Sequence, residues 1–239
     1  MICPHCQKPY FFLDRPQRES RGHCERCHFR GAVQWPSYDS YHEDLYLSKS
    51  YRRTCQTDPQ MNWILKTLRI QPSDVAVDLG CGVGDYTQAI GNLTKQVKGF
   101  DLNVEAARRK YPGLLFLELD FTKEIPLPAS SVDKIISINT IEHLLDYEFF
   151  LKECRRILKP GGLIALSTAN KSFILHDLHY DATHLHEWTL AGFTQLAGEY
   201  FKKLAAKKDC AMFYYFPLNR VAGIFLKPDI TFIGERSDC

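Results

Sequence analysis

A glycine-rich segment of this 239-residue chain has the residue types and spacing that chemistry on a bound nucleotide-like group would need. Gly80, Gly82 and Gly84 alternate directly after the apolar run at residues 75–79. Glycine lets a backbone turn sharply and approach a ligand closely, so this turn is typical of a ligand-binding loop. The dinucleotide pattern G-x-G-x-x-G fails in both frames, because Asp85 and Thr87 stand where its last glycine belongs.

Carboxylates follow the glycine turn at the places where strands are expected to end. Asp78 precedes the first glycine, Asp101 ends the second apolar run, and Asp120 ends the third. Ligands of open α/β sheets lie beyond the carboxyl ends of the strands. We therefore expect Asp101 to accept hydrogen bonds from two ribose hydroxyls. We expect Asp120 to meet an adenine amino group, with Phe121 beside the ring.

Strand-like and helix-like segments alternate from about residue 57 onward, and these elements must position the candidate residues. The expected strands are residues 75–79, 97–102, 114–120, 132–139, 163–168, 209–216 and 229–235. The expected helices are one opening at Asp58-Pro59 and those at residues 85–94, 105–111, 142–158 and 188–201. Continuous apolar strands that alternate with helices predict an α/β fold with a parallel sheet covered on both faces.

In this order and spacing the segments resemble the class I S-adenosylmethionine-dependent methyltransferases, of the small-molecule, type 11-like kind. The likeness rests on VDLGCGVG at residues 77–84, on Asp101 and Asp120, on INTIEHL at 138–144 and on LKPGG at 158–162. It implies a Rossmann-like, seven-stranded, mostly parallel sheet whose last strand, near 229–234, runs antiparallel.

The same resemblance implies a binding site for S-adenosylmethionine. The glycine turn and Asp78 would hold the methionine part, Asp101 the ribose and Asp120 the adenine. The cofactor-binding residues that we expect are Asp78, Gly80, Cys81, Gly82, Gly84, Asp101, Leu102, Asp120, Phe121 and Asn139.

Two histidines are candidates for a catalytic base. Methyl transfer from a sulfonium is an in-line displacement that depends mainly on orientation, and a base is needed only where the acceptor must lose a proton. His143 follows the fourth expected strand, and His184 lies in a segment, 181–188, that resembles the acceptor loop of small-molecule methyltransferases. We expect His143 or His184 to be the base. The alternatives are a capping or packing role for His143 and a metal site built from Glu142, His143 and the loop.

Four cysteines form a C-x₂-C…C-x₂-C array near the N-terminus: Cys3, Cys6, Cys24 and Cys27. This spacing predicts a closed, structural Zn²⁺ site, and about 30 residues cannot build a sufficient core without such a metal. Residues 1–31 therefore resemble a zinc ribbon, with a redox-active dithiol pair as the alternative. Residues 32–56 are expected to be a linker or lid, and residues 57–239 the methyltransferase domain.

Composition limits the partners. Lys and Arg number 30 and Asp and Glu 28, a net charge of +2 that does not favour nucleic-acid binding. No apolar run is long enough for a membrane helix, and no secretory signal opens the chain, so the nine cysteines suggest a reducing cytoplasm. The sequence makes no prediction of an oligomeric state.

The function that follows is methyl transfer from S-adenosylmethionine to a small-molecule acceptor at an oxygen, nitrogen or carbon atom. The first alternative is an rRNA or tRNA base methyltransferase guided by the zinc ribbon, whose arginines would contact phosphate. The second is a non-catalytic protein that binds the cofactor or a partner.

Overall fold

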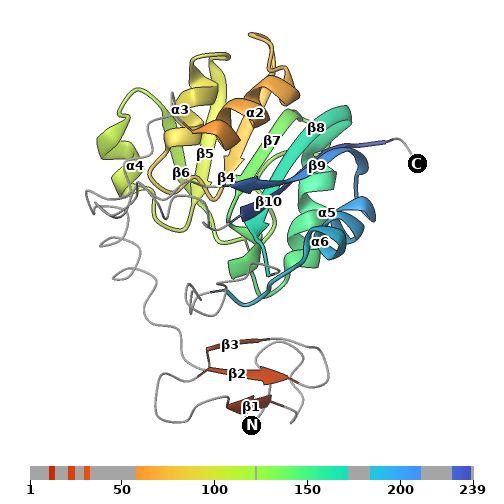
Figure 1. Cartoon of the computed structure of the whole chain (residues 1–239). Coiled ribbons are helices and arrows are strands. Elements are labelled where there is room, and N and C mark those ends of the chain that lie inside the picture. Colours follow the sequence, from red (N-terminus) through yellow and green to blue (C-terminus); the bar gives the residue numbers. More distant parts are fainter. Residues whose placement is uncertain are drawn as a thin grey trace, which may run out of the picture.

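The computed structural model describes residues 58–121, 123–171, 184–210 and 228–237, together with the backbone of three short strands near the N-terminus. One sheet of seven strands organises the larger part (Figure 1). Its strands are β4 Val75–Leu79, β5 Gln96–Asp101, β6 Leu115–Glu118, β7 Val132–Ile138, β8 Leu158–Ala169, β9 Lys202–Cys210 and β10 Pro228–Glu235.

The strand order is β6-β5-β4-β7-β8-β10-β9. Neighbours from β6 to β8 pair in parallel, whereas β10 pairs antiparallel with both β8 and β9. The predicted seven-stranded, mostly parallel sheet is therefore confirmed, and so is the antiparallel strand expected near residues 229–234. The parallel strands β4, β5, β6 and β7 bring the candidate residues to one edge of the sheet.

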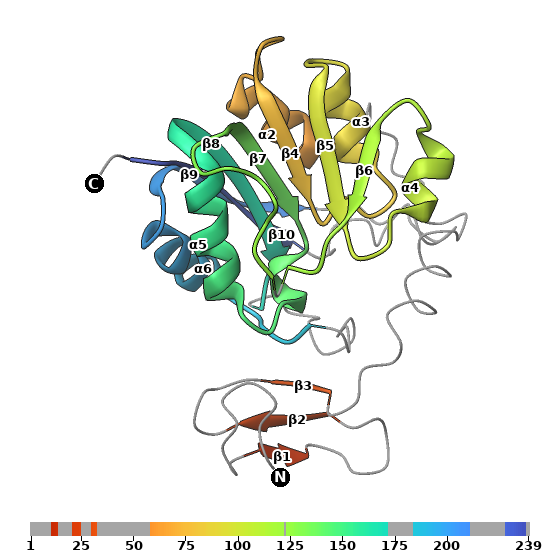
Figure 2. The same ribbon diagram turned by 180° about the vertical axis from the view of Figure 1, so that it is seen from behind.

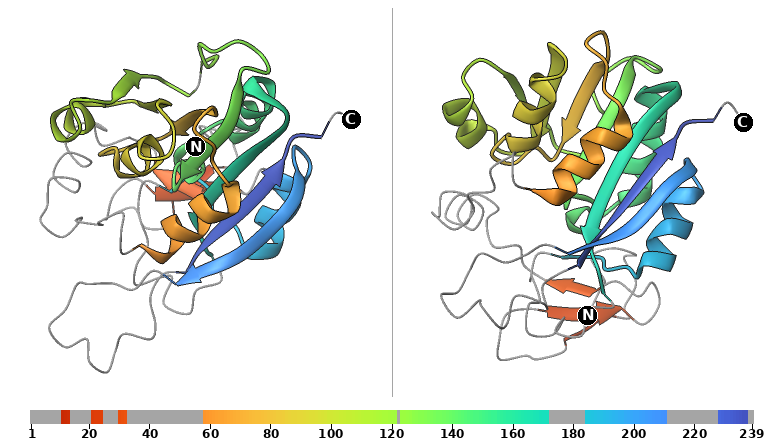
Figure 3. Two further views of the ribbon diagram at one scale, coloured as in Figure 1. Left: turned by 90° about the horizontal axis from the view of Figure 1, so that it is seen from above. Right: turned by 45° about the horizontal axis from the view of Figure 1, so that its top comes forward.

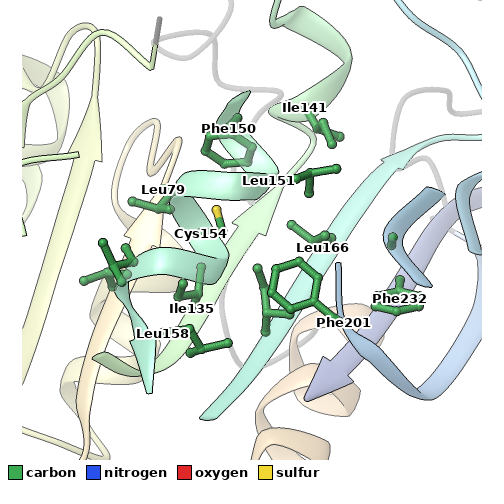
Figure 4. Packing of buried hydrophobic residues seen from close by; sticks show 14 of the residues in the cluster. Leu79, Ile135, Ile141, Phe150, Leu151, Cys154, Leu158, Leu166, Phe201 and Phe232 are labelled. Atoms are coloured by element: carbon green, nitrogen blue, oxygen red, sulfur yellow. The ribbon is translucent and has the colours of Figure 1, made fainter. Parts of the chain in front are cut away.

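Helices cover both faces of the sheet, as expected (Figures 2 and 3). They are α2 Pro59–Leu68, α3 Asp85–Gly91, α4 Glu105–Lys110, α5 Tyr147–Ile157 and α6 Leu190–Gly198. Helices α2 and α3 bury Ile64, Leu68 and Ile90 against one face. Helices α5 and α6 bury the other face in a larger cluster that includes Phe150, Cys154 and Phe193, part of which Figure 4 shows.

Two helix starts follow from capping side chains. The Asp58 carboxylate accepts from the amides of Gln60 and Met61 at 2.9 and 3.4 Å, and Pro59 occupies the first turn of α2. The Asp146 carboxylate caps α5 by accepting from the Phe149 amide at 2.8 Å. The helix predicted from residue 142 therefore begins at Tyr147, and residues Ile141–His143 form a separate 3₁₀ turn, η2.

The prediction of a strand at residues 209–216 was wrong in its placement. Strand β9 begins at Lys202, and residues 211–216 lie outside the described part of the chain. The strand forms the edge of the sheet, where lysines discourage pairing with another chain. Lys202, Lys203, Lys207 and Lys208 hide the apolar alternation that reveals a buried strand.

Three short strands near the N-terminus form a separate antiparallel sheet in the order β1-β2-β3: β1 Phe11–Leu13, β2 Arg21–Cys24 and β3 Arg30–Ala32. Cys24 is the last residue of β2. The predicted metal ligands Cys3, Cys6 and Cys27 lie outside the described residues, as does the expected linker or lid at 32–56 apart from its first residue, Ala32, which ends β3. Within the described residues, none of the helices has the length and apolar character needed to cross a membrane.

Candidate active site

The glycine turn after β4 has the tight backbone that the sequence predicts. Gly80, Gly82 and Gly84 have φ values of 83°, 51° and 85°, in the left-handed region that favours glycine. The Gly80 and Cys81 amides donate to the Phe100 carbonyl at 2.7 and 3.0 Å, which ties the turn to the end of β5. A Cβ atom at Gly80 would lie 2.0 Å from the Thr140 hydroxyl oxygen. The turn is therefore closed from behind by Thr140, two residues after the end of β7.

Asp101 holds the glycine turn from the neighbouring strand. Its carboxylate accepts from the Gly82 amide at 2.8 Å, and the residue is only 6% exposed. Its carbonyl accepts from the Leu119 amide at 2.8 Å, which joins the end of β5 to the chain that leaves β6. One residue thus fixes the turn and the chain after β6, and its contact with a ribose stays a prediction.

Asp78 is a buried carboxyl behind the turn. The Thr87 hydroxyl of α3 donates to its carboxylate at 2.6 Å. Burial raises the pKa of Asp78 to about 7, because desolvation disfavours the charged form more than the Thr87 hydrogen bond favours it. The charges of Asp101 and Asp85 raise this pKa further.

This raised pKa predicts a pH-dependent cost of folding. Both states are protonated below the ordinary pKa of 3.8, and the cost grows as the pH rises toward about 7. Asp78→Asn removes the titration. We expect Asp78→Asn to stabilise the protein relative to the wild type, by about 2–3 kcal/mol more at pH 8 than at pH 5. Urea denaturation of the cofactor-free protein measures this difference in the free energy of unfolding.

The contrasting variant is Asp133→Asn. Hydrogen bonds from Lys159 and from the Val75 amide lower the pKa of Asp133, so its contribution to stability is lost as the pH falls. Equal effects of Asp78→Asn at the two pH values would contradict the prediction.

Asp120 and Phe121 lie at the exit of β6, with different surroundings. The Asp120 side chain is 37% exposed, and its carboxylate lies 3.6 Å from the Lys123 ammonium. Phe121 is buried, and its ring meets Phe150 edge-on at 5.3 Å between centroids. Asp120 is thus accessible to a ligand, whereas Phe121 anchors the loop in the core. The adenine contact stays a prediction for both residues.

Two other expected cofactor residues are Leu102, which follows Asp101, and Cys81, which lies within the glycine turn. Leu102 is 46% exposed directly after Asp101, and Cys81 is buried in a cluster with Val104 and Phe116. Burial raises the pKa of the Cys81 thiol, which makes it a packing group rather than a nucleophile.

Asn139 follows β7 in a left-handed conformation, with φ of 51°. Its amide side chain accepts from the Ser167 hydroxyl at 2.8 Å and donates to the Asp229 carboxylate at 3.2 Å. The Gln60 amide of α2 donates to Ser167 and to Thr231, each at 3.0 Å. Asn139 therefore belongs to a polar network that ties α2 to β7, β8 and β10. This network could not be predicted from the sequence, because its members are isolated polar residues with no common spacing.

The two candidate bases meet. The rings of His143 and His184 lie 5.0 Å apart between centroids, at an angle of 69°. The Glu142 carbonyl accepts from the Leu185 and His186 amides at 2.7 and 3.2 Å, so the turn after β7 is bonded to the segment that enters α6. Two further histidines of the segment before His184, His176 and His179, lie outside the described residues.

Glu142 completes this group. Its side chain is fully buried, and burial raises its pKa to about 8, with the charge of nearby Asp229 acting in the same direction. The Ala169 amide donates a long hydrogen bond to its Oε1 atom at 3.4 Å, and this contact and the Thr168 hydroxyl only partly offset the effect of burial on the pKa of Glu142. Glu142, His143 and His184 each offer one ligand atom, and these atoms lie within 4.8 Å of one another.

The fold and the turn agree with known proteins. Residues 77–166 match the family model Methyltransf_11, a methyltransferase domain. This match agrees with the resemblance to a methyltransferase domain seen in the sequence. It spans the glycine turn, Asp101, Asp120 and the segment with Glu142 and His143.

Two relatives are similar over the same part of the chain. A Mycolicibacterium smegmatis protein, named probable S-adenosylmethionine-dependent methyltransferase, is 33% identical over 125 residues, 50% of this chain and 48% of that protein. A ubiquinone biosynthesis O-methyltransferase of Bradyrhizobium diazoefficiens is 32% identical over 126 residues, 47% of this chain and 50% of its own length. The chain thus spans about half the length of the curated relatives that it matches.

A solved structure extends the likeness of fold beyond the methyltransferase domain match. One chain of the complex between the Haloferax volcanii Trm112 methyltransferase activator and a methyltransferase superposes with a TM-score of 0.68. That similarity covers 84% of this chain and 98% of the other, at 18% identity. It supports the Rossmann-like fold and no particular substrate.

Proposed function

We propose that this protein transfers a methyl group from S-adenosylmethionine to a small-molecule acceptor. The observation that carries the proposal is the Asp101 carboxylate, which accepts from the Gly82 amide inside a turn of three left-handed glycines. That arrangement leaves a backbone cradle beside a carboxylate at the carboxyl edge of a parallel sheet. The methyltransferase domain match and the relatives named as S-adenosylmethionine-dependent enzymes support this cofactor.

In this proposal the methionine part of the cofactor lies along the glycine turn near Asp78, the ribose on Asp101 and the adenine near Asp120. The sulfonium then faces the residues that follow β7. The acceptor attacks the methyl carbon opposite the sulfur, a bond to carbon forms as the carbon–sulfur bond breaks, and the electron pair stays on sulfur. Orientation in the pocket supplies much of the rate acceleration.

The histidine pair favours an acceptor that must lose a proton, and a hydroxyl group fits best. His143 or His184 would accept that proton, a step that contributes about 10²–10⁴-fold to rate. The relatives that act in ubiquinone biosynthesis are named O-methyltransferases, which supports oxygen as the methylated atom. We therefore propose a hydroxylated small molecule as the acceptor class.

The test is in two steps on the full chain. Calorimetry with S-adenosylhomocysteine should show binding, and a panel of phenols and catechols with radiolabelled S-adenosylmethionine should yield a methylated product. His143→Gln and His184→Gln should lower kcat about 10²-fold or more and change S-adenosylhomocysteine affinity by less than about twofold. Well-folded protein that binds no S-adenosylhomocysteine would overturn the proposal.

We also propose that Cys3, Cys6, Cys24 and Cys27 hold a structural Zn²⁺ ion. Support comes from their spacing and from the small antiparallel sheet, whose strand β2 ends on Cys24. A segment of about 30 residues cannot build a sufficient core alone, so a metal would supply the folding energy. Zinc analysis of purified protein should give at least one ion per chain, and Cys24→Ser should lower that content.

A further inference from the structure

Three ligand-type side chains from distant parts of the sequence converge beside the proposed acceptor site. Glu142 and His143 belong to the turn after β7, and His184 belongs to the segment that leads into α6. One potential ligand atom from each lies within 4.8 Å of the other two. Donor atoms of a bound dication with bonds of about 2.0–2.2 Å lie up to about 4.2 Å apart, so shifts of under about 1 Å would complete the site.

The backbone holds this cluster in place. The Leu185 and His186 amides both donate to the Glu142 carbonyl, and the His143 amide donates to the Thr140 carbonyl at 3.0 Å. These bonds fix the two ligand segments against each other without using the side chains of the cluster. The arrangement is preorganised by the fold, as a binding site requires.

The carboxylate of the cluster has a buried oxygen to which no residue in the described part of the chain donates a hydrogen bond. Glu142 is fully buried, and its Oε2 atom has no partner among the described residues. Such an atom is costly to bury and calls for an explanation, of which a bound ion is one. Asp229, itself 4% exposed, adds negative charge that acts on Glu142. A cation at this point would satisfy the oxygen and offset the charge.

We propose that Glu142, His143 and His184 bind one divalent transition-metal ion of the Zn²⁺, Mn²⁺ or Fe²⁺ class. Two imidazoles and one carboxylate are the donors that these ions accept, and three protein ligands leave a position open for a substrate oxygen. The proposal rests on the proposed methyl transfer and deepens it, because the open position would select acceptors with a hydroxyl group.

In this arrangement His143 and His184 would be ligands rather than bases. A dication held by Glu142 and the two histidines would lower the pKa of an acceptor hydroxyl, whose proton would then pass to solvent water. The oxygen attacks the methyl carbon, the carbon–oxygen bond forms as the carbon–sulfur bond breaks, and the electron pair leaves with sulfur as a neutral thioether. Charge and atoms balance without a further reactant.

The experiment is a Mn²⁺ titration of the full chain, followed by electron paramagnetic resonance. Mn²⁺ prefers oxygen and nitrogen ligands, so it reports on this cluster and not on the four-cysteine site. The wild type should bind one Mn²⁺ per chain. Glu142→Gln and His184→Gln should each weaken that binding at least tenfold, whereas the matched control His186→Gln should leave it within about twofold.

Calorimetry with S-adenosylhomocysteine on the same samples separates the two proposals and verifies folding. Normal S-adenosylhomocysteine binding without Mn²⁺ binding by the wild type, at up to millimolar metal, overturns the metal site alone. Mn²⁺ binding without S-adenosylhomocysteine binding overturns the proposed function and leaves the metal site. Undiminished Mn²⁺ binding by both Glu142→Gln and His184→Gln would place the ion elsewhere and also overturn the site.

Discussion

Replacement of Gly80 by alanine is expected to abolish S-adenosylhomocysteine binding and to lower the free energy of unfolding by about 2–5 kcal/mol. The backbone at Gly80 has φ of 83°, which costs an L-residue about 1–2 kcal/mol. The added Cβ would also lie 2.0 Å from Oγ1, 2.6 Å from Cγ2 and 2.8 Å from Cβ of Thr140. Because all three atoms are too close, no rotation of Thr140 relieves the contact, and overpacking adds about 1–3 kcal/mol.

The control for this variant is the same substitution at Gly113. Alanine there meets no atom within 4 Å, so stability should change by less than about 0.5 kcal/mol, with affinity unchanged. Thr140→Ala in the Gly80→Ala background should restore part of the lost stability, because it removes the two nearest atoms. Urea denaturation and calorimetry measure both quantities, and wild-type affinity in Gly80→Ala would refute the role of the turn.

Asp101→Ala should weaken S-adenosylhomocysteine binding at least 100-fold. Hydrogen bonds to a charged group contribute about 1.5–3 kcal/mol each, and the carboxylate is proposed to bind the ribose. The same substitution removes the acceptor of the Gly82 amide at 2.8 Å, so the turn loses its anchor as well. Asp101→Asn, which keeps an acceptor oxygen but loses the charge, should have an intermediate affinity.

A matched control comes from the next strand. Glu118 ends β6 beside Asp101 in the parallel register, and its side chain is 63% exposed with only a 3.9 Å contact to Arg108. Glu118→Ala should therefore change affinity by less than about twofold. If Asp101→Ala bound S-adenosylhomocysteine as tightly as Glu118→Ala, the assignment of the cofactor site to this edge would be wrong.

Much of the fold could be predicted from the sequence, because its central strands carry short buried apolar stretches that alternate with helical segments. Strand β4 is mostly apolar and almost fully buried, whereas β5 and β7 combine buried apolar residues with Lys98, Asp133 and Lys134 at partly buried positions. The start of the edge strand β9 was misplaced because Lys202, Lys203 and Lys208 are exposed and interrupt the apolar pattern. The start of α5 was misplaced because Asp146 caps the helix five residues after the first apolar signal.

The site was predictable only where backbone geometry dictates residue type. Glycines that adopt positive φ values can be recognised in the sequence by their spacing, and a carboxylate can be recognised by its place at the end of an expected strand. The meeting of His143 with His184 depends on how the segment 184–186 bonds to the Glu142 carbonyl. Contacts between residues about 40 positions apart have no local signature. The sequence therefore named both histidines as competitors, whereas the structure places them together.

The position of β10 constrains how the polypeptide can mature on the ribosome. The strand lies between β8 and β9, both of which are synthesised before it. Until β10 emerges, the facing edges of β8 and β9 have unpaired backbone hydrogen-bonding groups. Each edge can then pair with a strand of another chain. A stop codon just before residue 228 would remove an interior strand of the sheet rather than an edge strand. The truncated product would be a target for chaperones and proteases.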